Sequence, residues 1–131
     1  MLSTWSDKSG RISVDAVLVP MGNDLCVAIT GGERPHLGAA AVAQVRPSLA
    51  DPARLSATTS VITLLGHKEN IVATRVAHDL AAGLNKNVAV ACGIHVDNIT
   101  SQEMQFVNEA IARFCKDVIS SATGKEDRSC R

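Results

Sequence analysis

Apolar and polar residues alternate along the first part of the chain in a pattern that predicts β-strands. Between residues 11 and 20 the apolar side chains recur at every second position, as they do in a strand that is half buried. A turn containing Gly22 follows, and residues 25–30 form another apolar run, which Gly31 and Gly32 end. The two runs predict a hairpin of antiparallel strands.

Three later segments add strands to this predicted sheet. Residues 38–45 are small and apolar on both faces, which is typical of an interior strand. Residues 58–65 are rich in β-branched and apolar side chains, and Gly66 follows them. Residues 88–92 form a short apolar strand that ends at Gly93. The sequence therefore predicts five strands.

Two further segments carry apolar residues at helical spacing. Residues 69–84 predict an amphipathic helix. A second helix is predicted to begin after Thr100, because Thr100 and Glu103 have the spacing of a capping box, and Ile99 with Met104 would form a hydrophobic staple. The residues predicted to face the core are Val72, Val76, Ala77, Leu80, Ala81 and Leu84 in the first helix, and Met104, Val107, Ile111, Phe114, Cys115 and Val118 in the second.

The order of these elements is β-β-β-β-α-β-α, which predicts an α+β domain with a mixed β-sheet and two helices packed on one face. We predict one domain over residues 11–121, between a flexible N-terminus of residues 1–10 and a flexible C-terminal tail of residues 122–131. The face of the sheet opposite the helices would then have to be covered by something else. The small residues of the predicted strand at 38–45 favour a face-to-face homodimer.

Composition narrows the possible partners. The 131 residues include 13 basic and 13 acidic side chains, so the formal net charge is zero and neither nucleic acid nor an anionic membrane surface is expected to bind. Apolar runs are all shorter than the roughly 18 residues that span a bilayer. Residues 1–10 lack the basic-then-apolar order of a signal peptide, so we expect a cytoplasmic protein.

Cysteines and aromatic residues are few. We interpret Cys26, Cys92 and Cys115 as small core residues, since they lie in apolar segments without metal-ligand spacing, and Cys130 as part of the tail. The aromatic side chains are one tryptophan and two phenylalanines. A site for a flat ring would therefore need aliphatic walls, a backbone plane, an arginine or a neighbouring subunit.

Three histidines lie next to predicted strand ends. His36 precedes the strand at 38–45, His67 follows the strand at 58–65, and His95 follows the strand at 88–92. If the first two strands are antiparallel neighbours and the last two run parallel through a right-handed crossover, all three histidines share one edge of the sheet. One such histidine alone is usually structural, but three that converge predict a binding site.

Acidic and glycine residues near these histidines suggest two kinds of ligand. Glu33, Glu69 and Asp97 place carboxylates at the same edge, and imidazole with carboxylate suits zinc, manganese or iron. The helix start at Lys68 and the backbone at Gly31 and Gly32 would instead suit a phosphate. Both possibilities stay open at this point. The candidate metal ligands are His36, His67, Glu69 and His95.

Residues 31–39, 66–69 and 93–99 together resemble the LpdD-like family, small accessory proteins of gallate-type UbiD decarboxylases. The resemblance implies a chaperone that binds prenylated FMN and helps to deliver or mature it in a UbiD-type hydroxyarylic acid decarboxylase, rather than an enzyme. It also implies that the flavin phosphate lies at the Lys68 helix start or on a divalent cation, with the tricyclic ring over the small side chains of residues 38–45. The candidate cofactor-binding residues are Gly31, Gly32, His36, Gly38, Gly66, His67, Lys68, Glu69, His95 and Asp97, and none is expected to be catalytic.

The residues by themselves leave a second function open. A small metal-dependent hydrolase or lyase would use the same histidines to hold a metal that activates water, with Glu69 as general base. His78 is not part of either proposal, since it lies in the middle of a predicted helix next to Asp79 and is expected near a solvated face.

Overall fold

The computed structural model describes residues 1–64 and 70–124 and places them in a six-stranded mixed β-sheet with two helices. This arrangement confirms the predicted α+β class and the predicted number of helices. The strands are β1 (Thr4–Ser9), β2 (Ile12–Met21), β3 (Asp24–Gly32), β4 (Ala39–Pro47), β5 (Leu55–Thr63) and β6 (Val88–His95), and the helices are α1 (Asn70–Leu84) and α2 (Ser101–Thr123).

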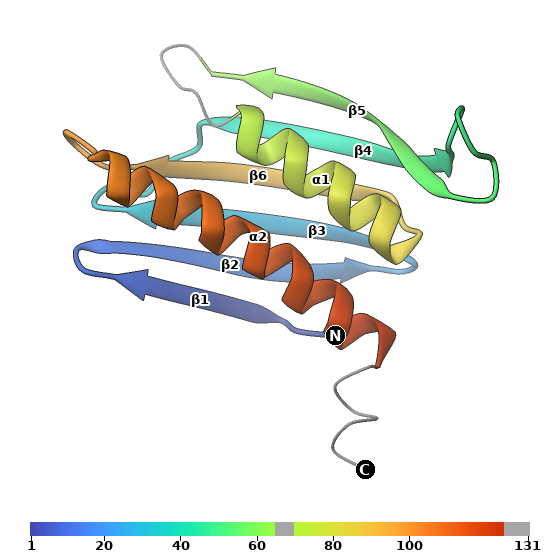
Figure 1. The fold of residues 1–131 in the computed structure, drawn as a ribbon, viewed down its shortest axis with the longest axis horizontal. Helices are drawn as coiled ribbons and strands as arrows, with labels where there is room; N and C mark the ends of the chain where they lie inside the picture. Colours follow the sequence, from blue (N-terminus) through green and yellow to red (C-terminus); the bar gives the residue numbers. More distant parts are fainter. Residues whose placement is uncertain (65–69, 125–131) are drawn as a thin grey trace.

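The strands lie in the order β1-β2-β3-β6-β4-β5, as Figure 1 shows. Strand β6 pairs parallel with β3 and antiparallel with β4, and β4 pairs antiparallel with β5. The antiparallel pairing of β4 with β5 was predicted. Strands β5 and β6 also point in the same direction, as predicted, but β4 lies between them. The ends of β3 and β6 and the start of β4 therefore meet at one edge of the sheet.

The N-terminus differs from the prediction. Residues 1–10 were expected to be flexible, but Thr4–Ser9 forms the edge strand β1, paired antiparallel with β2. Its side chains are mostly polar, so the sequence pattern lacks the apolar alternation of a strand. Trp5 supplies the missing packing: its ring meets Phe114 of α2 edge to face at 5.3 Å, and its Nε1 donates a hydrogen bond to Asp117 at 2.9 Å.

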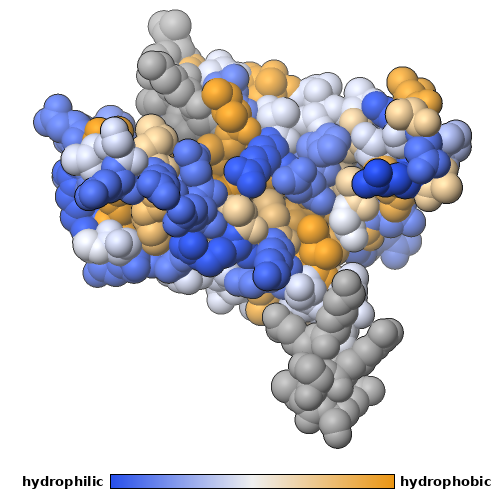
Figure 2. Space-filling model, in the orientation of Figure 1, coloured by the Kyte–Doolittle hydropathy of each residue, from blue (hydrophilic) through white to orange (hydrophobic). Residues whose placement is uncertain are grey.

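Both helices cover the same face of the sheet (Figure 1). Alternate strand residues and one stripe of each helix meet there, and the largest side chains of this core include Phe114, Leu80 and Ile29. The outer side of the helices is mainly hydrophilic, as Figure 2 shows in the same orientation. Among the described residues, neither helix combines the length and apolar character that a membrane crossing requires.

The predicted capping box at the start of α2 is confirmed. Thr100 accepts a hydrogen bond from the Glu103 backbone, and the Glu103 side chain accepts one from the Thr100 backbone. Met104 was predicted to be buried but is 46% exposed, because the buried face of α2 begins one turn later, at Val107. The helix continues to Thr123, so the predicted tail begins later than residue 122.

The other face of the sheet is uncovered among the described residues. Because successive strand residues point to opposite faces, Ala39, Ala41 and Ala43 are buried beneath the helices while Ala40 and Val42 face outward. The small residues of β4 therefore belong mostly to the core. Of these small residues, only Ala40 and Val42 lie on the open face, and the placement of a flavin ring over this strand stays a prediction.

Candidate functional site

The structure brings His36 and His95 together at the edge where β3 and β6 end and β4 begins. Gly32, the last residue of β3, pairs with His95, the last residue of β6. His36 lies in the loop that leads to β4, and its ring meets the His95 ring edge to face with 5.7 Å between centroids. The convergence predicted for these two histidines is therefore observed.

Close backbone packing explains the glycines at this edge. A Cβ atom on Gly93 would overlap the carbonyl oxygen of His36, because the loop before β4 crosses directly over β6. Gly32 has a φ of +76°, and a Cβ atom added to it would likewise overlap the carbonyl oxygen of His95. Gly38 is held through its backbone, which donates to Cys92 at 2.8 Å. These glycines place the histidine loop against the sheet.

A charged pair orients His95. Its Nε2 lies 2.8 Å from Asp97 Oδ1 and 3.0 Å from Arg34 Nη2, and Arg34 also donates to both Asp97 carboxylate oxygens. The hydrogen bond from His95, with the nearby Arg34 guanidinium, lowers the pKa of Asp97 below its ordinary value. Asp97 is therefore a carboxylate at neutral pH and fixes the position of the imidazole.

Arg11 ties together the segments that carry these side chains. Its guanidinium donates to Glu103 at 2.7 and 2.9 Å, to Glu33 at 2.7 Å and to the Asp97 carbonyl oxygen at 2.9 Å. The hydrogen bonds from Arg11 and from the Thr100 backbone lower the pKa of Glu103 to about 2. These contacts of Arg11 join the turn before β2, the loop after β3, the loop after β6 and the start of α2, and so they hold the loops of His36 and His95 in place.

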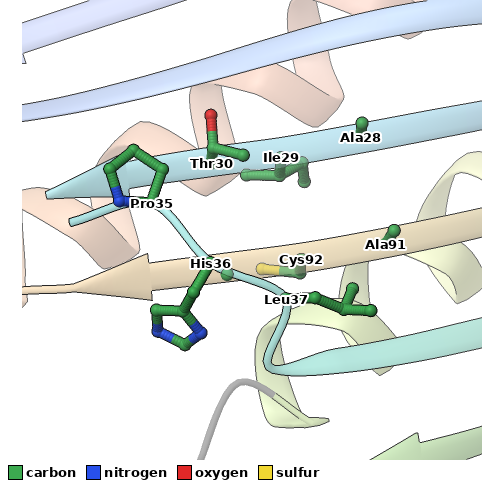
Figure 3. Close-up of a pocket in the computed structure, with 9 residues that line it drawn as sticks. Ala28, Ile29, Thr30, Pro35, His36, Leu37, Ala91 and Cys92 are labelled. Atoms are coloured by element: carbon green, nitrogen blue, oxygen red, sulfur yellow. The ribbon is translucent and has the colours of Figure 1, made fainter.

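A shallow pocket of about 300 Å³ opens beside His36 on the uncovered face of the sheet. Figure 3 views this face, with the helices behind the sheet and the loop of Pro35, His36 and Leu37 crossing in front of β6. Small side chains on β3 and β6 form the floor, and the crossing loop forms a wall. The lining residues are Ala28, Ile29, Thr30, Pro35, His36, Leu37, Ala91, Cys92 and Gly93.

Comparison with known proteins identifies the family. The model of the prenylated flavin chaperone LpdD-like domain matches residues 8–123 of the chain. The chain belongs to this LpdD-like family. Protein LpdD of Lactiplantibacillus plantarum is 26% identical over 110 residues, and the match covers 79% of this chain and 72% of that protein. The family is one of chaperones, in agreement with the prediction that the protein is not an enzyme.

The fold of this LpdD-like chain also resembles a protein in the crystal structure of a novel chaperone complex for yeast 20S proteasome assembly. The TM-score is 0.51, and the match covers 92% of this chain and 98% of that one. At 13% sequence identity the resemblance concerns the fold alone.

Part of the predicted site lies outside the described residues. Gly66, His67, Lys68 and Glu69 belong to residues 65–69, so the structure does not place them relative to His36. Two of the four predicted metal ligands, His67 and Glu69, therefore lie outside the described residues. Within residues 1–64 and 70–124, no group of three or more histidine, cysteine, aspartate or glutamate side chains is arranged to hold a metal ion.

Sequence reasoning overlooked several residues of this site in the LpdD-like chain. Arg11 has partners 22 to 92 positions away, and Arg34 has partners 61 to 63 positions away, separations that no local pattern indicates. Ala28 and Ala91 were treated only as parts of strands. The one local signal was the run from Glu33 to His36, in which Arg34 stands between an acid and the predicted ligand.

A second pocket, of about 510 Å³, lies along α1 and β5, away from the histidine edge. His78 is in its lining, half buried, with Nδ1 3.3 Å from Asp79 Oδ1 and Nε2 3.5 Å from Ser56 Oγ. The predicted position of His78 near a solvated face agrees with this placement. His78 therefore offers a control for substitutions of the other histidines.

Proposed function

We propose that this protein binds prenylated FMN in the pocket beside His36 and helps to deliver or mature it in a UbiD-type hydroxyarylic acid decarboxylase. Membership of the prenylated flavin chaperone family, over residues 8–123, is the observation that carries the proposal. A metal-dependent hydrolase or lyase, the alternative raised by the sequence, has no support from a family of chaperones.

The pocket has features that suit a flat ring. Ala28, Ala91 and Gly93 give its floor little side-chain height, so a planar molecule can approach β3 and β6 closely. The lining of the pocket is mostly apolar. Its volume of about 300 Å³ is at the lower end of ordinary ligand pockets. Such a space would hold the ring system while the rest of the cofactor extends over the rim.

The rim has groups that suit the phosphate and the ring oxygens. Arg34 has a side chain that is 68% exposed, and a guanidinium can donate two parallel hydrogen bonds to a phosphate. His36 and His95 stand beside it. We therefore propose His36, His95, Asp97 and Arg34 as binding or positioning residues, with Gly31, Gly32, Gly38 and Gly93 shaping the backbone around them.

The residues at 66–69 remain part of the proposal. Gly66, His67, Lys68 and Glu69 directly precede α1 in the sequence, and these residues would suit a phosphate or a divalent cation. The cytoplasmic location and the UbiD-type partner also remain proposals, based on the sequence and on the family.

Cofactor transfer tests the function. Protein loaded with prenylated FMN should activate an apo-decarboxylase faster than the same concentration of free cofactor, and the His95→Ala variant should lose at least about tenfold of this effect. The loss corresponds to one charge-assisted hydrogen bond of about 1.5 to 3 kcal/mol. His78→Ala, at the α1 pocket, is the matched control and should behave like the wild type.

The initial rate of decarboxylation after mixing is the quantity to measure. Equal rates with free and protein-bound cofactor would contradict the delivery function. Metal analysis of the loaded protein, with and without chelator treatment, would show whether a divalent cation accompanies the flavin.

A further inference from the structure

The face of the sheet opposite the helices carries a continuous band of apolar side chains. The register of β2, β3, β6, β4 and β5 arranges the outward residues in two rows across the strands. Nine of the ten side chains in these rows are apolar and none is charged. One row is Val17, Ala28, Ala91, Ala40 and Ile62, and the other is Val19, Cys26, Ala89, Val42 and Ser60.

This apolar band is exposed in the single chain. Ile62 is 72% exposed and Val42 57% exposed, and Val17 and Val19 are about half exposed. Monomeric proteins rarely expose a continuous apolar patch larger than a few hundred Å². The band therefore indicates an interface.

The face is large enough for a stable pair. Its five strands are eight to ten residues long, and with strands about 4.8 Å apart and a rise of about 3.3 Å per residue the whole face presents roughly 600 Å² in projection. The apolar band crosses the middle of this face, and the charged Asp15 and Arg46 lie outside the band. The accessible area of side chains exceeds their projection. A standard interface buries about 800 Å² per partner, so this face alone approaches what a dimer needs.

The shape and chemistry of the band suit a second copy of the chain. Three alanines and Cys26 fill its centre on β3 and β6. Larger residues stand on both sides, Val17 and Val19 on β2 and Val42 and Ile62 on β4 and β5. A copy related by a two-fold axis can set its larger residues over the alanines of the first. Interfaces of homodimers are also more apolar than those of transient complexes, and the absence of charge within the band avoids repulsion between two identical bands.

We propose that two copies of this chain pack through this band, sheet face to sheet face, as a homodimer. Ala28 and Ala91 belong both to the band and to the floor of the pocket beside His36, so the second copy closes the open side of that pocket. If the flavin proposal is correct, the bound ring lies between the two chains. The dimer itself does not depend on the flavin.

The mass of the flavin-free protein in solution tests the proposal. The wild type should have twice the 13.8 kDa of one chain by sedimentation or light scattering at tens of micromolar. Val42→Arg and Val19→Arg should each halve the mass, because a charge within an apolar interface stays unpaired. Ile71→Arg on α1, also at a highly exposed position but outside the band, is the matched control and should remain dimeric.

Thiol labelling gives a second readout in a Cys130→Ser background. Cys26 lies within the band, whereas Cys115 is buried and its pKa is raised to about 12, so Cys115 should stay unreactive. Cys26 should react several-fold faster in Val42→Arg than in the parent dimer. A monomeric wild type, or a dimer that survives both arginine variants with Cys26 unprotected, would overturn the proposal. Flavin binding by a monomeric wild type would leave the proposed function intact, so the two failures are distinguishable.

Discussion

Replacing Gly93 with alanine should lower the free energy of unfolding by about 3 kcal/mol, the upper range of overpacking changes. The added Cβ atom would overlap the carbonyl oxygen of His36, and backbone on both sides leaves no flexible side chain to move away. The loop must then separate from β6, which also disrupts the hydrogen bond from Gly38 to Cys92. Thermal unfolding followed by circular dichroism should show a loss of roughly 10 °C.

Gly22→Asn is the control for this experiment. Gly22 also has a positive φ, of +62°, but an added Cβ would meet nothing within 4 Å, and asparagine tolerates this conformation. Its melting temperature should change little. If Gly93→Ala has the melting temperature of the wild type, the His36 loop does not cross β6 as closely as described, and this loop would not form the wall of the pocket.

The largest expected effect on stability comes from Phe114→Ala, at about 3 to 5 kcal/mol. Phe114 is 1% exposed, lies at the centre of the contact between α2 and the sheet, and packs edge to face against Trp5 of β1. Removing the ring leaves a cavity under the edge strand. Urea denaturation should show the loss, and emission of the single tryptophan should shift to longer wavelength as β1 loosens.

Phe106→Ala provides the comparison within the same helix. Phe106 is only partly buried against the core and lies 5.8 Å from the Arg113 guanidinium, so truncating it should cost clearly less. Equal losses at the two positions would contradict the assignment of Phe114 to the core contact that holds β1.

Local sequence patterns predicted most elements of this fold, because each pattern reports on one segment. Alternation identified β2 and β3, helical spacing identified α1 and α2, and the capping-box spacing of Thr100 and Glu103 is realised in the structure. Strand β1 was not predicted, because an edge strand buries few side chains and most residues of β1 are polar. The position of β6 between β3 and β4 was not predicted either, because the periodicity of a segment does not indicate which strands it pairs with.

Only those parts of the candidate site that lie next to strand ends could be predicted from the sequence. His36 and His95 adjoin strand ends that the topology brings to one edge, so their approach followed from the order of elements. Which alanines face outward did not follow, because β4 is small on both faces and a shift of one residue exchanges Ala40 with Ala39 and Ala41. The ion pairs of Arg11 join distant segments and appear only in three dimensions.

The central claim is that flavin binds on the floor formed by β3 and β6, and an anaerobic absorbance titration with prenylated FMN tests it most directly. Ala91→Leu adds bulk within the pocket, whereas Ala112→Leu makes the same change at an exposed position of α2, outside both the pocket lining and the apolar band. We expect saturable binding by the wild type and by Ala112→Leu, and at least tenfold weaker binding by Ala91→Leu. Absence of saturable binding by the wild type, or equal affinities for the two variants, would contradict the account.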